Sequence, residues 1–172
     1  MSEEFLYGEV PEHFVDRELL RLGKEAFEFC VRQYGDGNRP LRLRWIRKSE
    51  TDYLYAQVLD NLAKLGGEKV DRLERSYEKI ESIYGLVRNR LTGKKEKSGS
   101  IFVAAETPVS MIVRVVGHEF YHWKYSPPGF SNETDEQAAN KFGERIEREM
   151  AEAARAEAME KWRQRYRELR KK

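Results

Sequence analysis

Hydrophobic positions recur with a helical period near the beginning of the chain. In residues 14–33 the apolar side chains are three or four positions apart, and the pattern stops before Gly35-Asp36-Gly37. Residues 41–46 then alternate apolar and basic side chains, as half-exposed strands do. The pattern predicts an amphipathic helix followed by a strand, with Cys30 in the core because it belongs to the apolar face of the helix.

The middle of the chain predicts two further helices and two further strands. Residues 52–65 and 68–81 return to the helical period. Residues 83–88 and 100–105 are rich in β-branched and aromatic side chains, which favour strands. The polar segment 93–99 between these strands is typical of a solvated loop. We therefore expect a small sheet that is interrupted along the sequence by helices.

A helix that is apolar on nearly all sides is predicted after Thr107-Pro108. Threonine is a favoured N-cap, and proline is favoured at the first helical position. The main apolar face comprises Val109, Ile112, Val113, Val116, Phe120 and Trp123. Such a helix is buried, so His118 and His122 on it need polar partners in the interior.

These two histidines belong to the pentapeptide His118-Glu119-Phe120-Tyr121-His122 and are two of only three in the chain. Imidazoles four residues apart share one helical face and can bind one metal ion. Glu119 is placed beside them to act on a water molecule at the metal. The motif predicts the metal site of a zinc metallopeptidase, but it supplies only two of the three ligands that a catalytic zinc ion needs.

The third ligand is expected in the helix predicted after Ser126-Pro127-Pro128-Gly129. Two histidines and one glutamate form an established ligand set for catalytic zinc, and Glu133 and Glu136 are both candidates. We choose Glu136, because Asn140 follows one turn later. There its amide oxygen can accept a hydrogen bond from the unligated ring nitrogen of His118 and fix the tautomer. The expected cofactor is Zn²⁺ bound by His118, His122 and Glu136.

From about residue 82 to 146 the sequence resembles the compact gluzincin metallopeptidases, namely the minigluzincins and the ImmA/IrrE-like and SprT-like peptidases. The resemblance rests on Val115-Val116-Gly117-His118-Glu119-x-x-His122 and the closely following Glu136-x-x-Ala139-Asn140-x-Phe142. It implies an α+β, zincin-like fold in which about three strands pack on an active-site helix and a glutamate helix. Phe120 and Tyr121 are bulkier than the residues often found inside the motif. After Phe142, which matches the family's phenylalanine, the usual small residue is here Gly143. These departures concern the shape of the pocket.

The resemblance also implies a zinc metalloendopeptidase that acts on peptides or proteins. His118, His122 and Glu136 would bind zinc, Glu119 would act as general base and acid, and Asn140 would support His118. The substrate would pair with an edge strand that faces the cleft, and we expect that strand to be formed by Ile101, Phe102, Val103 and Ala104. Candidates for stabilising the oxyanion of the transition state are Tyr125, Tyr166 and His13.

Length and residue pattern predict one domain, residues 1–150, that includes an N-terminal helical part. Residues 151–172 would extend the last helix, because residues 132–170 lack proline and contain only one glycine. The apolar stripe of this helix can pack on the domain or pair with another copy of the chain. It comprises Ala139, Phe142, Ile146, Met150, Ala153, Ala156, Met159, Trp162, Tyr166 and Leu169.

The charge balance argues against a dedicated nucleic-acid-binding protein. The chain has 32 Lys and Arg residues against 30 Asp and Glu, a formal net charge of +2. The basic end, residues 161–172, is more typical of a solvated helix end. One cysteine excludes an intramolecular disulfide. From the residue pattern we expect neither a signal peptide nor a membrane-spanning segment. We expect a cytoplasmic protein without membrane contact.

Two alternatives to an active peptidase remain open at this stage. One is a zincin-fold regulatory or binding protein that keeps zinc and has little activity. The other is a latent enzyme whose cleft is filled by a terminal segment of its own chain.

Overall fold

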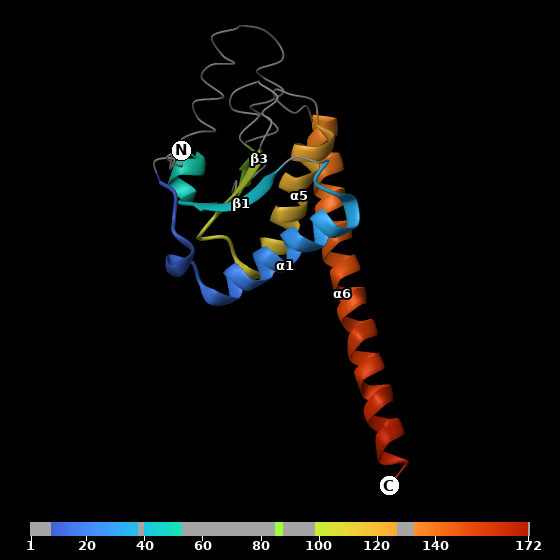
Figure 1. The fold of residues 1–172 in the computed structure, drawn as a ribbon. Helices are drawn as coiled ribbons and strands as arrows, with labels where there is room; N and C mark the ends of the chain where they lie inside the picture. Colours follow the sequence, from blue (N-terminus) through green and yellow to red (C-terminus); the bar gives the residue numbers. More distant parts are fainter. Residues whose placement is uncertain (1–7, 38–39, 53–84, 88–98, 127–132, 172) are drawn as a thin grey trace, which may run out of the picture.

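The computed structural model describes residues 8–37, 40–52, 85–87, 99–126 and 133–171. They form an α+β domain with one long helix that extends away from it (Figure 1). The predicted helix at 68–81, all but the first residue of the predicted helix at 52–65, and most of the predicted loop at 93–99 lie outside the described residues. In chain order the elements are η1 (Glu12–Phe14), α1 (Arg17–Tyr34), β1 (Leu41–Ile46), β2 (Gly85–Val87), β3 (Gly99–Ala104), η2 (Val109–Met111), α5 (Ile112–Tyr125) and α6 (Glu133–Leu169).

Helix α1 confirms the first predicted helix and buries its apolar face in the core. Asp16 caps the helix, because its carboxylate accepts hydrogen bonds from the backbone N–H groups of Glu18 and Leu19. The helix ends where Gly35 adopts a φ of 76°, a conformation that favours glycine. Cys30 is fully buried, which confirms its predicted place in the core.

The described sheet has three strands in the order β1-β3-β2, with β1 parallel and β2 antiparallel to β3. All three predicted strands are confirmed, and Gly85–Val87 is the described part of the strand predicted at 83–88. The predicted position of β3 at the sheet edge is wrong, because β3 is the central strand and is paired on both sides. Its residues Ile101, Phe102, Val103 and Ala104 are all fully buried. A continuous apolar run of this kind is typical of a strand buried on both faces.

The entry into helix α5 differs from the predicted N-cap. The hydroxyl of Thr107 donates a hydrogen bond to the carbonyl oxygen of Ala104 at 2.6 Å, and it therefore closes the turn after β3. The short helix η2 then precedes α5, and Val109 is 42% exposed instead of buried. The other apolar residues of the predicted face are at least half-buried, and Ile112, Val116, Phe120 and Trp123 lie in the core.

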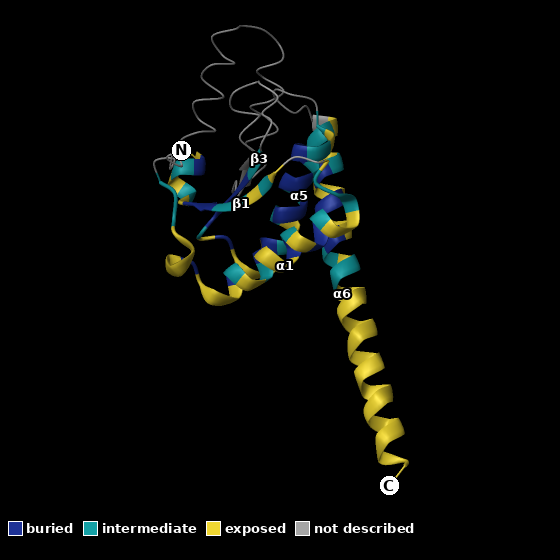
Figure 2. Ribbon diagram, in the orientation of Figure 1, coloured by how far each residue is buried: buried dark blue, intermediate teal, exposed yellow. Residues whose placement is uncertain are grey.

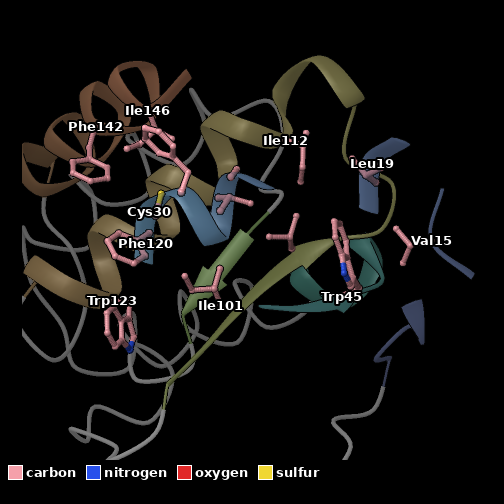
Figure 3. Packing of buried hydrophobic residues seen from close by; sticks show 14 residues of the cluster. Val15, Leu19, Cys30, Trp45, Ile101, Ile112, Phe120, Trp123, Phe142 and Ile146 are labelled. Atoms are coloured by element: carbon pink, nitrogen blue, oxygen red, sulfur yellow. The ribbon is translucent and has the colours of Figure 1, made fainter. Parts of the chain in front are cut away.

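Helices α5 and α6 cross closely at two glycines. A Cβ atom added at Gly117 of α5 would lie 3.0 Å from the Cα of Gly143 of α6. Side chains from α1, β1, β3, α5 and α6 form one core, which includes Leu19, Trp45, Ile101, Phe120 and Ile146 (Figure 3). The close approach of the two backbones brings the first turns of α6 next to the histidine-bearing face of α5.

Helix α6 leaves the domain after residue 150 and continues as a single helix (Figure 2). Every residue from 151 to 170 is exposed. The exposed side chains include large apolar ones, namely Met159, Trp162, Tyr166 and Leu169. Within the described part of the chain, we find no helix with the length and apolar content required to cross a membrane.

Candidate metal centre

Three predicted ligands meet between α5 and the first turn of α6. One donor atom each from His118, His122 and Glu136 lies within 4.8 Å of the others. The Nε2 atoms of the two histidines are 2.9 Å apart. The two carboxylate oxygens of Glu136 lie 3.2 Å from Nε2 of His118 and 3.3 Å from Nε2 of His122. The group is therefore close enough to hold a metal ion.

The outer nitrogen of His118 has the partner that the sequence predicts. Its Nδ1 lies 2.9 Å from Oδ1 of Asn140, which is one helical turn after Glu136. An amide oxygen can only accept a hydrogen bond, so Nδ1 must carry the hydrogen. In the neutral imidazole this leaves the lone pair on Nε2, which faces His122 and Glu136.

The outer nitrogen of His122 is held by two residues that sequence reasoning missed. Its Nδ1 lies 2.8 Å from Oγ of Ser126 and 3.2 Å from Oδ2 of Asp135. The hydroxyl of Ser126 is directed to the Asp135 carboxylate at 2.8 and 2.9 Å, so its oxygen accepts the hydrogen of His122. His122 consequently also presents a lone pair at Nε2.

A signal for these two residues is present in the sequence. Ser126 follows His122 by four residues, the same helical spacing that joins His118 to His122. Asp135 immediately precedes Glu136, so both project from the first turn of α6, but toward different atoms of the site. Spacing alone could not find the pair, because their contact depends on the turn between α5 and α6.

This arrangement of donors fits a cation. Two lone pairs and a carboxylate that face one another within 3.3 Å repel unless a positive charge lies between them. Ligands bound tetrahedrally at ~2.0–2.1 Å lie about 3.3 Å from one another. The separations here are 2.9, 3.2 and 3.3 Å, so small movements would give three donors the geometry of a tetrahedral metal site.

Glu119 lies beside the three donors and is buried with a relative exposure of 3%. Its Oε1 is 3.8 Å from Nε2 of His118. Its Oε2 is buried without a hydrogen-bond partner among the described residues. A buried carboxylate oxygen without a partner is costly, and a water molecule at the metal would supply one.

The remaining predicted site residues are not brought together with this group. Tyr166 follows Glu136 by thirty residues on the same helix. At 1.5 Å per residue it lies about 45 Å from Glu136. The prediction that Tyr166 stabilises the oxyanion in its own chain is therefore wrong. His13 lies in η1, at the opposite edge of the domain from α6 (Figure 1), and its ring contacts the tilted ring of Phe14. Tyr125 is on the last turn of α5, half-exposed, and packs against Phe142. Of Glu133 the structure describes only the backbone, which begins α6.

Comparison with known proteins finds no match to a described protein family, to a curated protein sequence or to a solved structure.

Proposed function

We propose that this chain is a zinc-dependent metallopeptidase of the compact gluzincin type, with a zincin-like fold. The observation that carries the proposal is the convergence of His118, His122 and Glu136 beside the buried Glu119. The outer nitrogen of each histidine is held so that its Nε2 faces the other donors. The motif and the spacing to Glu136 and Asn140, which resemble those of the gluzincins, support the same conclusion.

In the proposed reaction, His118, His122 and Glu136 bind the metal and Glu119 transfers protons. Zinc at such a site lowers the pKa of a bound water to ~7 and polarises the carbonyl group of a substrate. Glu119 is not one of the three converging donors, and its free buried oxygen can take a proton from water and pass it to the leaving amine. Asn140, Ser126 and Asp135 hold the imidazoles in one tautomer and orientation.

An extended peptide substrate needs a strand with an open edge. Since β3 is central, we infer that the substrate lies along β2 (Gly85–Val87), which is at the end of the described sheet opposite to β1 and contacts α5. Main-chain pairing there would bind unfolded segments without a strong demand on their sequence.

Cleavage of an unfolded protein by the wild type and by Glu119→Gln tests the peptidase reaction. We expect the variant to keep its zinc and to lose cleavage by about 10²–10⁴-fold, because Glu119 moves protons and does not bind the metal. Glu144→Gln, an exposed glutamate on α6, is the matched control and should cleave like the wild type. Equal cleavage by wild type and Glu119→Gln would contradict the proposal.

Metal analysis tests the ligand set separately. Purified protein should contain one Zn²⁺ per chain, and His122→Ala should lose it. Stoichiometric zinc in His122→Ala would refute the ligand set. Wild-type protein that binds one zinc ion but cleaves neither peptides nor unfolded proteins would support the regulatory or binding protein instead.

The arrangement of α6 bears on the latent form of the enzyme. The C-terminal segment from residue 151 to 170 is exposed and extends away from the domain that carries the site (Figure 1). It therefore does not cover the converging donors of its own chain. Helix α1 contributes Leu19, Phe29 and Cys30 to the core, so a truncation that removes it would test folding instead of latency.

A further inference from the structure

The exposed half of α6 carries an ordered stripe of apolar residues. At about 100° per residue, the stripe residues fall within about 60° of one direction along five helical turns. They are Ala151, Ala154, Ala158, Trp162, Tyr166 and Leu169. The first three are small, and the last three are large and 60%, 47% and 72% exposed. Trp162 and Tyr166 stack on each other with ring centroids 5.5 Å apart. Large side chains in such a stripe are unfavourable in water and mark an interaction surface.

We propose that this stripe pairs with the same stripe of a second copy of the chain, so that the two α6 helices run antiparallel around a twofold axis near Glu160. In that arrangement Ala151 lies at the level of Leu169 of the second copy, because both are nine residues from Glu160. Ala154 and Tyr166 are both six residues from it, and Ala158 and Trp162 are both two residues from it. Each small side chain of the stripe thus lies opposite a large side chain of the second copy. This allows the two helix axes to approach to the ~8–10 Å that is usual for packed helices.

The charges of the exposed segment favour the same orientation. Residues 151–160 contain three acidic and one basic side chain, whereas residues 161–171 contain six basic and one acidic. An antiparallel pair places the acidic half of each helix beside the basic half of the other. A parallel pair would place the two basic halves side by side, which like-charge repulsion disfavours. The charge distribution also explains why we infer a second copy and not an unrelated partner: the segment complements itself when reversed.

The area available corresponds to a small, reversible dimer interface. A tryptophan or tyrosine buries about 150–250 Å² when it is enclosed. Because Trp162 and Tyr166 are 60% and 47% exposed, two of each contribute roughly 300–550 Å². Leu169 of each chain adds to this area, so the contact stays below the ~1,200 Å² of standard interfaces and is of the size found in weak, reversible complexes. The exposed segment of about 30 Å is long enough to accommodate this contact.

Sedimentation equilibrium of the full-length protein tests the pairing. We expect a dimer at micromolar concentration and a dissociation constant at least tenfold higher for Ala158→Trp, which sets two large residues at one level. Gln164→Trp on the opposite face, an exposed and uncharged position, is the matched control and should dimerise like the wild type. The double variant with Ala158→Trp and Trp162→Ala should recover most of the affinity, since it exchanges the small and large positions. A monomeric wild type at 100-fold higher concentration would overturn the proposal, whether or not the monomer binds another macromolecule.

Disulfide formation tests the orientation. A mixture of chains carrying Ala151→Cys and chains carrying Leu169→Cys should form the mixed disulfide upon mild oxidation. Chains carrying Ala151→Cys alone should not cross-link, because an antiparallel pair separates these two positions by about 27 Å. Efficient cross-linking of Ala151→Cys with itself would show a parallel pair and overturn the arrangement. Circular dichroism and zinc content should stay unchanged in every variant, since the segment is outside the domain.

Discussion

The Asp135 carboxylate on α6 lies 3.2 Å from Nδ1 of His122 on α5 and accepts the hydroxyl hydrogen of Ser126, which also contacts that nitrogen. The first turn of α6 therefore supplies both the third donor, Glu136, and the group that orients the second histidine. A carboxylate in this position fixes the ring and raises the basicity of the opposite nitrogen.

Replacing Asp135 should weaken zinc binding without removing a ligand. We expect Asp135→Ala to raise the zinc dissociation constant about 10–100-fold in a competition titration with a chelator. Ser126→Ala should have a smaller effect, because Asp135 remains next to the nitrogen. Glu144→Ala, which removes an exposed charge from the same helix, is the control. Unchanged affinity in Asp135→Ala would show that His122 does not depend on this carboxylate.

Asn140 offers a test in which the direction of the effect depends on hydrogen bonding. Asn140→Asp keeps an oxygen that accepts from Nδ1 of His118, so we expect zinc affinity equal to or above that of the wild type. Asn140→Leu has a similar size but no acceptor and should lower the affinity about tenfold or more. The chelator titration used for Asp135 measures both variants. A similar loss of zinc affinity in Asn140→Asp and Asn140→Leu would mean that Asn140 acts through its amide N–H group and not through its oxygen.

Much of the candidate site follows from helical spacing. His118, His122, Glu136 and Asn140 are related by steps of four residues within two helices, and a local period fixes such relations wherever the helices form. The strand at 41–46 and helix α1 are predictable for the same reason, because alternation and helical period are local patterns.

The incorrect predictions concern relations that local patterns do not determine. The sequence of β3 could not show that β1 pairs with it in parallel from far away along the chain. Thr107 is typical of a helix cap, but the carbonyl group of Ala104 competes for its hydroxyl. Tyr166 was a plausible oxyanion donor only while the direction of α6 relative to the domain was unknown.

The glycine crossing of α5 and α6 predicts a coupling between stability and metal binding. A Cβ added at Gly143 would lie 2.5 Å from the backbone oxygen of Arg114, so Gly143→Ala must push the helices apart. We expect a loss of roughly 1–3 kcal/mol of unfolding free energy in urea titrations without metal. Zinc affinity should fall as well, because Glu136 moves with α6.

Lys141→Ala is the control for Gly143→Ala, since it adds no volume and its side chain is exposed on the same part of α6. Alanine usually stabilises a helix relative to glycine by about 1 kcal/mol. A Gly143→Ala protein more stable than the wild type would therefore show that the helices can separate at no cost.

Cys30 should be chemically inert in the folded protein. Burial, together with a smaller effect from the charge of Glu149, raises the pKa of its thiol from 9.0 to about 12. At pH 8 a thiol reagent should modify it only after denaturation. The unfolded chain releases the thiol proton near pH 9 while the folded protein retains it up to about pH 12, so this group lowers stability as the pH rises across that interval. Cys30→Ala should make the unfolding free energy fall less steeply between about pH 9 and pH 12. An equally steep fall in the variant would contradict the raised pKa of Cys30.

The order of the elements along the chain has a consequence for how the protein acquires its structure. Pairing of β1 with β3 must wait until a long intervening segment has closed, which makes non-local contacts slow to form. The three converging donors instead lie within the single hairpin of α5 and α6, whose contacts are close in sequence. We therefore expect the contacts between α5 and α6 that assemble the donors to form earlier in folding than the pairing of β1 with β3.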